Sequence, residues 1–300
     1  MEVGLGSSSR FVEQEIDVRS PLVTDGASRE AVRFHYDIGN EFYALWLDRS
    51  MTYSAALWGD AVELDEAQRN KLEFHIDWVG ARSASRVLDV GCGWGSLAQR
   101  LVQEGQTKGV TALTLSEQQA RYVRHLELPG VEVRVESWEE HKPTHNYDAV
   151  FCIGAMEHFV SPLMSSEDRV RKYRRFFASC AEWLKPGGCL SLQTSAYGNG
   201  SFVSGAIASI FPESDLPRLE QLISAADHRL EIVEVRNDRH DYVLTCRSWL
   251  DRLTRRREEA IVQIGEETTR HYEAFLSAAA RGFESGVFSL LRMKFQRRTK

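Results

Sequence analysis

Three glycines follow an acidic residue at the end of a short apolar run in this 300-residue chain. The acid is Asp89, the glycines are Gly91, Gly93 and Gly95, and a helical pattern begins directly after them. Glycine has no Cβ, so the chain can turn tightly there and a ligand can approach the backbone closely. The spacing G-x-G-x-G differs from the G-x-G-x-x-G of dinucleotide sites. With an acid two residues ahead, it favours a cofactor that carries a cationic amino acid, such as S-adenosylmethionine (SAM), over a pyrophosphate; the alternative is a glycine-rich turn without a ligand.

A carboxylate and an imidazole stand side by side at Glu157 and His158, directly after another apolar run. Either group can act as a general base or orient an acceptor. A sulfonium nearby would keep Glu157 ionised, because an opposite charge favours the charged form of an acid. The structural alternatives are a glutamate that accepts hydrogen bonds from its own loop and an ordinary packed histidine.

Further candidates follow the second and third apolar runs. In open parallel sheets an acid at the end of the second strand often binds the ribose hydroxyls. Here that strand ends in Thr114 and Leu115 without an acid, and the amide of Gln119, one helical turn later, is the candidate replacement. Trp138 follows the third run and is expected either to cover an adenine ring or to pack in the core.

Strands and helices alternate from residue 86 onward, which predicts an α/β fold with a mostly parallel sheet and helices on both faces. Ligands then bind at the carboxyl ends of the strands. The predicted strands are 86–91, 109–116, 131–137, 147–154, 189–195 and 230–238, and the predicted helices are 96–105, 117–128, 169–184 and 247–264.

The remaining segments predict a single domain, 29–300, with additions. Residues 1–28 are polar and predict a flexible N-terminal arm. Residues 29–80 carry helical patterns at 30–48 and 64–80 and predict an N-terminal helical cap. The apolar, glycine- and proline-bearing segment 199–228 predicts a lid inserted into the domain.

Composition narrows the partners and the compartment. A net charge of −6 and a pI near 5.9 argue against nucleic-acid binding. No apolar run is long enough to span a bilayer, and the N-terminus lacks signal-peptide features. Five scattered cysteines without a C-x-x-C pair favour reduced thiols in the cytoplasm and no metal site. The basic segment 289–300 predicts a solvated final element or, less favoured, a weak peripheral membrane contact.

Several ordered blocks of the sequence resemble one known family, the cyclopropane-fatty-acid-synthase-like (mycolic acid cyclopropane synthase-like) class I SAM-dependent methyltransferases. The resemblance implies a Rossmann-like fold with a mostly parallel seven-stranded sheet and SAM as cofactor. It implies cofactor contacts from Tyr53, Gly91, Thr114, Leu115, Gln119, Trp138 and Ile153. The blocks are 34–58, 64–73, 87–98, 114–119, 153–159, 211–217, 240–249 and 272–286.

The resemblance also implies a second bound group, which the sequence supports only in part. In lipid-modifying members a bicarbonate ion acts as the general base, held by a cysteine, a glutamate, a histidine, a backbone amide and a tyrosine. Glu157 and Tyr242 match that set, but Ala55 replaces the cysteine and Gln193 the histidine. A histidine can change its charge near neutral pH, whereas a glutamine only forms hydrogen bonds. Glu157, His158, Gln193 and Tyr242 are therefore the catalytic candidates, and bicarbonate is doubtful.

Four functions remain open from the sequence. The first is methyl transfer from SAM to a carbon of a small or medium apolar metabolite in secondary metabolism, which the altered anion site favours. The second is a cyclopropane synthase or fatty-acyl lipid methyltransferase, which the lid favours. The third is a small-molecule N-methyltransferase, since amine-methylating relatives share the Glu-His pair. The fourth is a SAM-binding regulator without turnover. The expected partner is a small apolar acceptor, and the sequence allows a homodimer.

Overall fold

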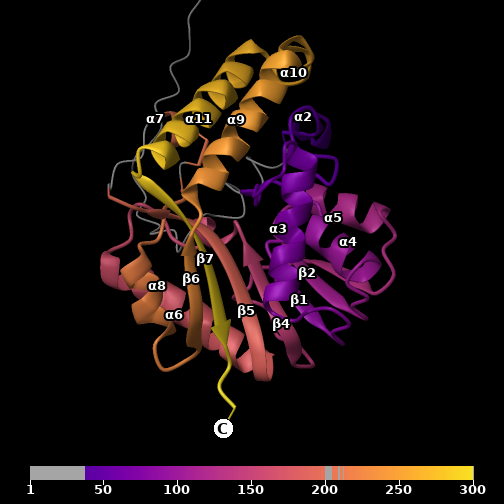
Figure 1. Ribbon diagram of the computed structural model, residues 1–300, viewed down its shortest axis with the longest axis vertical. Helices are drawn as coiled ribbons and strands as arrows, with labels where there is room; N and C mark the ends of the chain where they lie inside the picture. The colour runs from indigo at the N-terminus through magenta and orange to yellow at the C-terminus, as the bar shows by residue number, and fades with distance from the viewer. Residues whose placement is uncertain (1–37, 200–204, 209, 212, 300) are drawn as a thin grey trace, which may run out of the picture.

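The computed structural model describes residues 38–299, apart from 200–204, 209 and 212. The predicted arm, 1–28, and the start of the predicted cap therefore lie outside the described residues. The strands form a single seven-stranded sheet in the order β3-β2-β1-β4-β5-β7-β6 (Figure 1). The strands are β1 Val87–Val90, β2 Val110–Thr114, β3 Val131–Val135, β4 Tyr147–Ile153, β5 Leu184–Tyr197, β6 Glu231–Asn237 and β7 Phe288–Gln296.

Strand direction confirms the predicted class of fold. The five strands β1 to β5 run parallel, and β7 runs antiparallel between β5 and β6. All four residues of β1 are buried, Asp89 included, because both faces of the sheet are covered, as is usual for parallel strands. The carboxyl ends of β1 and β4 lie side by side, since Val90 is paired with Cys152.

Helices cover both faces of the sheet. On one face, α3 (Leu64–Trp78) and α4 (Ser96–Gln103) share a core with side chains of β1, β2 and β4. On the other face, α6 (Ser166–Trp183) and α8 (Leu219–Ala226) pack over β4, β5 and β7. Helix α5 (Glu117–His125) contacts β2 and β3.

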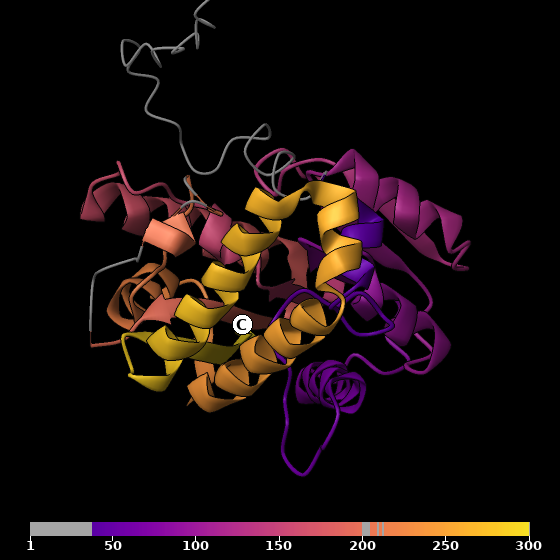
Figure 2. The ribbon, with the colours of Figure 1, turned by 90° about the horizontal axis from the view of Figure 1, so that it is seen from above.

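Three helices stand above the carboxyl ends of the parallel strands (Figures 1 and 2). They are α9 (Arg239–Arg255), α10 (Arg257–Ile264) and α11 (Glu266–Glu284). Together with α2 (Asn40–Ala44) they form an aromatic cluster that contains Trp46, Trp249 and Tyr272. The predicted helix 247–264 is in fact two helices that meet at Arg256, and the first of them begins eight residues earlier. No element was predicted for α11.

The predicted additions differ in several details. The helical pattern at 30–48 gives only the five-residue α2 among its described residues. Helix α8 falls within the predicted lid segment, but Leu222, Ala225 and Ala226 are buried in the core against α6. The basic C-terminal segment is largely strand β7, an interior strand of the sheet in which Arg292 is fully buried.

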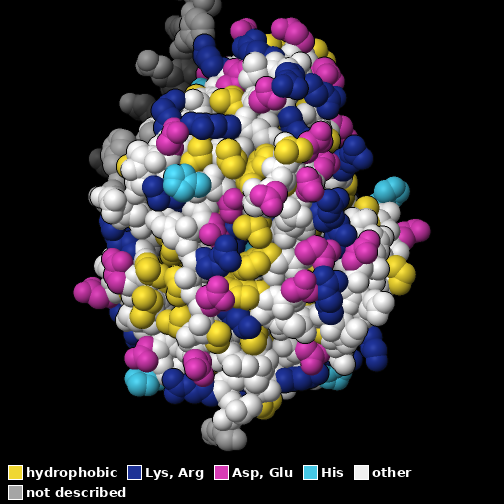
Figure 3. Space-filling model, viewed as in Figure 1, with side chains coloured by type: hydrophobic (Ala, Val, Ile, Leu, Met, Phe, Trp, Pro, Cys, Tyr) yellow, Lys and Arg dark blue, Asp and Glu magenta, His cyan; other side chains and the backbone are white. Residues whose placement is uncertain are grey.

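Charges of both signs are interspersed over the face shown in Figure 3. Most basic side chains there have acidic neighbours, so this face carries no broad field of one sign. Among the described helices, none is both long enough and apolar enough to cross a bilayer.

We expect Phe177→Ala to lower the free energy of unfolding by about 3–5 kcal/mol, because truncating a buried phenylalanine leaves a cavity. Phe177 in α6 is fully buried, and its ring centroid lies 4.9 Å from that of Phe295 in β7. Urea denaturation followed by circular dichroism measures the loss. The control Val262→Ala, at a side chain 87% exposed, should change stability by less than about 0.5 kcal/mol. Equal losses in both variants would contradict this account of the core.

Candidate active site

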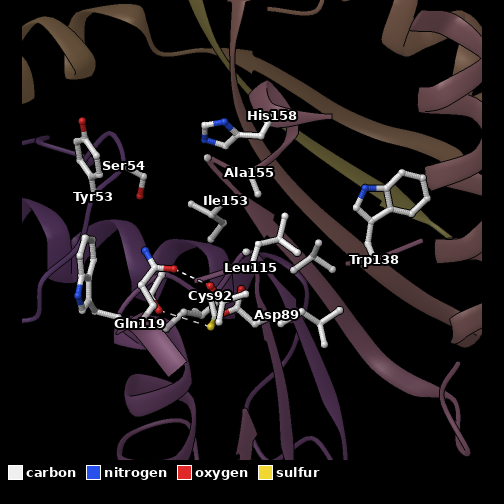
Figure 4. A pocket seen from close by; sticks show the side chains of 18 of the residues that line it. Tyr53, Ser54, Asp89, Cys92, Leu115, Gln119, Trp138, Ile153, Ala155 and His158 are labelled. Carbon is white, nitrogen blue, oxygen red and sulfur yellow. Dashed lines mark hydrogen bonds between the residues drawn. The ribbon is translucent and has the colours of Figure 1, made fainter. Parts of the chain in front are cut away.

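A cavity opens at the carboxyl ends of β1, β2 and β4, beside the glycine-rich turn; it is called the glycine-loop cavity below. Every cofactor-site residue expected from the sequence lines it, except Gly95. In Figure 4, Tyr53 and Trp138 lie on opposite sides, His158 lies at the top, and Asp89 and Cys92 lie near the base. The lining residues from that expected set are Tyr53, Asp89, Gly91, Gly93, Thr114, Leu115, Gln119, Trp138 and Ile153.

Two of the glycines are required by close packing. Gly91 has a φ of +79°, and a Cβ there would lie 2.4 Å from the Cβ of Ala155 in the loop after β4. Gly95 caps α4 with a φ of +83°, and a Cβ there would lie 2.9 Å from the side chain of Val123. Gly95 therefore sets how α4 and α5 pack, and the structure does not place it in the cavity wall.

A buried acid and a buried base face this cavity. Oδ2 of Asp89 is buried and has no hydrogen-bond partner among the described residues. Burial raises the pKa of Asp89 to about 7, although the charge of Lys71 opposes that effect. Lys71, which donates to Ser54 Oγ at 3.0 Å, is also fully buried, and burial lowers its pKa to about 7. A carboxylate left unpaired in a cavity is a ready acceptor for a cationic ligand group.

The side chains after β2 and β3 are held in place by local contacts. Thr114 Oγ1 donates to Gln119 Oε1 at 2.6 Å, and Ser116 caps α5 by accepting from the Gln119 backbone N–H at 3.2 Å. Trp138 packs against Phe159 and Phe176 at centroid distances of 5.2 and 5.3 Å. Trp138 therefore belongs to the core and also borders the cavity, while its contact with an adenine ring stays a prediction.

A second cavity adjoins the first and shares Tyr53, Gly154 and His158 with it; it is called the aromatic cavity. Its walls come from Ile207, Phe211, Ser214 and Leu216, from α9 and α11, and from the loop after β4. Among the described residues that line it, none is lysine or arginine, and most are apolar. They are Tyr53, Gly154, Glu157, His158, Ser195, Ile207, Phe211, Ser214, Leu216, Tyr242, Cys246, Trp249, Phe275, Ala279, Phe283 and Phe288.

Glu157 and His158 form the polar edge of the aromatic cavity, where the 3-10 turn η1 (Met156–His158) follows β4. Glu157 Oε1 accepts from the Ser195 backbone N–H at 2.6 Å, while its buried Oε2 has no hydrogen-bond partner among the residues that the structure describes. Burial raises the pKa of Glu157, and the hydrogen bonds from Ser195 partly offset that rise. His158 Nδ1 is hydrogen-bonded to Ser214 Oγ at 2.7 Å, and burial lowers its pKa to about 4, so it is neutral at physiological pH.

Gln193 lies elsewhere, although the sequence made it a catalytic candidate. It lines neither cavity. Its Oε1 accepts from Arg292 Nε at 2.8 Å and is hydrogen-bonded to His75 Nε2 at 3.2 Å, and its Nε2 donates to the Ala55 carbonyl at 3.2 Å. Tyr242, another of the four catalytic candidates, does line the aromatic cavity. The structure therefore places Gln193 outside the cavity that Tyr242 borders.

Sequence reasoning also missed Lys71. In α3 the polar residues Gln68, Lys71 and His75 recur on the same buried face as Leu64 and Leu72. Polar side chains spaced three and four residues apart on an apolar helical face were the available signal. Apart from Tyr242, the aromatic wall residues of α9 and α11 were missed, because no local pattern indicates which cavity a helix borders.

The glycine-loop cavity fits SAM on two observations of this structure. Gly91 packs against Ala155 with no room for a side chain, so the turn borders the cavity with its backbone, and the unpartnered Oδ2 of Asp89 suits a cationic amino group. The strand order and the site at the carboxyl ends of the strands are those of a nucleotide-type sheet. Fold and cavity together define a class I SAM-dependent methyltransferase.

Comparison with known proteins gives the family within that class. The chain matches the family described as mycolic acid cyclopropane synthetase over residues 24–293, and it belongs to that family. It is 31% identical to cyclopropane mycolic acid synthase 2 of Mycobacterium tuberculosis over 269 residues, covering 82% of this chain and 87% of the relative. It is 28% identical to the cyclopropane-fatty-acyl-phospholipid synthase of Escherichia coli over 265 residues, covering 88% of this chain and 66% of the relative.

Solved structures agree with this assignment. The cyclopropane synthase MmaA2 from Mycobacterium tuberculosis matches with a TM-score of 0.82 and 26% identity, over 90% of this chain and 99% of that chain. The mycolic acid cyclopropane synthase CmaA1, in complex with S-adenosylhomocysteine (SAH) and CTAB, matches with a TM-score of 0.81 and 27% identity over the same shares. A coclaurine N-methyltransferase, at 20% identity and a TM-score of 0.76 over 92% of this chain and 84% of that chain, shares the fold.

We expect Gly91→Ala to weaken SAH binding more than about tenfold, because the added methyl group must displace Ala155 and the loop from its present course. Isothermal titration calorimetry with SAH measures the loss. Gly80→Ala is the matched control: its φ of +65° is similarly strained, but its Cβ would meet nothing within 4 Å. The control should lose about 1–2 kcal/mol of stability and bind SAH normally. Unchanged SAH binding by Gly91→Ala would contradict the close approach.

We expect Asp89→Asn to weaken SAM binding by about 10- to 100-fold, since a hydrogen bond to a charged group contributes about 1.5–3 kcal/mol. Asparagine keeps the shape of the side chain, so folding should be preserved. Asp251→Asn, on the exposed part of α9, is the control and should bind SAM as the unaltered protein does. Calorimetry on both variants decides, and equal affinities would remove Asp89 from the cofactor site.

Proposed function

We propose that this enzyme transfers the methyl group of SAM to a carbon of an apolar acceptor in the aromatic cavity, and that the acceptor is an unsaturated acyl chain. The observation that carries the proposal is the cavity itself: it adjoins the cofactor cavity, its described walls are mostly apolar, and one buried carboxylate lies at its edge. The names of the relatives support an acyl chain, because they are cyclopropane synthases and fatty acid methyltransferases.

The residues of the glycine-loop cavity are assigned by the groups that they can bind. Asp89 would accept from the cationic amino group, and Gly91 and Gly93 would let the backbone approach the cofactor. Gln119 and Trp138 would contact its nucleoside end. When bound, SAM supplies an electrophilic methyl group on a positively charged sulfur. Aligning that group with the acceptor and excluding water can supply about 7–11 kcal/mol of the barrier lowering.

The aromatic walls suit the charge that develops during such a transfer. Methyl addition to a double bond leaves a positive charge on the neighbouring carbon, and aromatic faces stabilise cations. Tyr53, Tyr242 and Trp249 line the cavity and are the candidates for this contact. An apolar acyl chain gains from the same walls, because each buried CH₂ group contributes about 0.8 kcal/mol.

We propose that the lid predicted over 199–228 covers the aromatic cavity through some of its described residues. Ile207, Phe211, Ser214 and Leu216 line the aromatic cavity, and Ser214 is hydrogen-bonded to His158.

The N-terminal arm, the domain bounds and a homodimer stay predictions. All five cysteines are free and buried, which supports the expectation of a reducing compartment such as the cytoplasm.

A small apolar metabolite is the second candidate acceptor. One observation favours it: Ala55 and Gln193 stand at two positions where the lipid-modifying pattern has a cysteine and a histidine. Gln193 is hydrogen-bonded to Arg292 and lies outside the walls of the aromatic cavity. A changed base permits a changed substrate. An amine acceptor is the third candidate, since a carboxylate among aromatic rings also suits an ammonium group.

The test uses SAM with a fully deuterated methyl group and a panel of an oleoyl phospholipid vesicle, small isoprenoids and alkylamines, analysed by mass spectrometry. We expect label in the acyl chain. A cyclopropane product retains two deuterium atoms, whereas a methylated alkene retains all three. Label only in an isoprenoid or an amine would overturn the acyl proposal in favour of the second or third candidate.

Two variants check that the aromatic cavity holds the acceptor. Ala279→Phe adds bulk to a buried wall residue in α11 and should reduce transfer at least about tenfold, with SAH binding unchanged. Ala274→Phe, on the exposed face of the same helix, should leave both unchanged. Normal transfer by Ala279→Phe would place the acceptor elsewhere.

A further inference from the structure

The groups that would hold a bicarbonate ion are not assembled in this chain. Ala55 has no polar side-chain atom and packs in an apolar cluster with Phe283 and Leu290. Gln193 is fully buried and hydrogen-bonded to Arg292, His75 and the Ala55 carbonyl. Neither residue lines the aromatic cavity.

The position of Gln193 is also fixed by its hydrogen bond with Arg292. The Arg292 guanidinium, fully buried in β7, donates to Gln193 Oε1 while it pairs with Asp238 at 2.5 Å and Asp241 at 3.1 Å. A buried cation loses several kcal/mol when one of its partners leaves. Rotation of Gln193 toward the aromatic cavity would therefore be costly.

The remaining groups at the acceptor do not favour an added anion. The Ser195 backbone N–H already donates to Glu157 Oε1. His158 is neutral, because burial lowers its pKa to about 4, and no lysine or arginine is among the described wall residues. A bicarbonate ion there would be a second buried anion beside the Glu157 carboxylate. Like charges in a desolvated site repel, and one of them is driven to its neutral form.

Glu157 Oε2 is instead available for the proton. This oxygen is buried, has no hydrogen-bond partner within the described part of the chain, and belongs to a residue in the wall of the aromatic cavity. The hydrogen bond from Ser195 fixes the other oxygen at 2.6 Å and so orients the carboxylate. Burial raises the pKa of Glu157, which makes its carboxylate a stronger base than an exposed one.

We propose that this enzyme works without bicarbonate and that Glu157 Oε2 itself takes the proton from the methylated acceptor. The inference rests on methyl transfer to a carbon–carbon double bond, as proposed above. In that transfer the alkene electron pair forms the new C–C bond, and the electrons of the C–S bond leave with SAH. A C–H bond of the resulting cation then breaks. Its proton goes to Glu157, and its electron pair forms either the third ring bond of a cyclopropane or a new double bond.

Glu157→Gln is the central variant, because glutamine keeps the acceptor for Ser195 but cannot take the proton. We expect turnover in CO₂-depleted buffer to match turnover with added bicarbonate within about twofold, and Glu157→Gln to lower kcat by about 10²–10⁴-fold. Added bicarbonate should not rescue the variant, and SAH affinity should be unchanged by calorimetry. Glu167→Gln, on the exposed start of α6, is the control and should retain full activity.

The pH profile gives a second readout. A carboxylate base is active only when ionised, so kcat should rise with pH through the pKa of Glu157, which lies above the ordinary range for glutamate. This rising limb should vanish in Glu157→Gln. A purely structural role of Glu157 would lower kcat without removing the limb, and that result would overturn the proposal.

Binding of bicarbonate is measured separately from turnover. ¹³C-labelled bicarbonate is titrated against the SAH-bound protein, and its NMR linewidth is followed. We expect no broadening beyond that seen with the Glu157→Gln variant. Saturable broadening, or strong stimulation of turnover by bicarbonate, would overturn the proposal. If no acceptor on the panel is methylated, the proposed function fails, while this titration still decides whether the anion site exists.

Discussion

The side-by-side ends of β1 and β4 are the constraint on which the rest of the site depends. Val90 is paired with Cys152, so the turns that follow the two strands meet, and Gly91 packs where even one methyl group would collide with Ala155. This contact joins the two cavities, because the same β4 loop supplies Gly154 and His158 to both of them. Donor and acceptor are therefore brought together by backbone packing, before any side chain contributes chemistry.

Charge is distributed unequally between the two cavities. The glycine-loop cavity holds Asp89 and Lys71, whose pKa values burial moves toward each other, to about 7. The aromatic cavity has one carboxylate, Glu157, and among its described wall residues no positive charge. The first arrangement suits a ligand that carries both signs, as an amino acid does. The second suits a neutral acceptor that becomes positive for a short time.

The cofactor side was predictable from sequence because its signals are local. The Asp89–Gly95 run and the Thr114–Gln119 turn each lie within a few residues of a strand end, as does the Glu157-His158 pair beside the aromatic cavity, and parallel strands end at the same edge of a sheet. The surroundings of Gln193 could not be predicted, because its partner Arg292 is 99 residues away and lay in a segment expected to be a solvated terminal element. Apart from Tyr242, the walls from α9 and α11 were not predicted for the same reason: only tertiary packing brings these helices over the strand ends.

Arg292 connects Gln193 to several other segments that border the aromatic cavity. Its guanidinium binds Gln193 of β5, the Ala56 carbonyl after Tyr53, and Asp238 and Asp241 at the start of α9. Each of these segments also carries a wall residue of the aromatic cavity: Ser195, Tyr53 and Tyr242. A buried cation with four partners fixes these segments relative to one another, because loss of any partner would leave its charge uncompensated. A histidine at position 193 whose side chain faced the acceptor could not also accept the hydrogen bond from Arg292. Because Gln193 serves the Arg292 network, our proposal assigns proton removal to Glu157, whose Oε1 is hydrogen-bonded to the backbone of Ser195, two residues beyond Gln193 in β5.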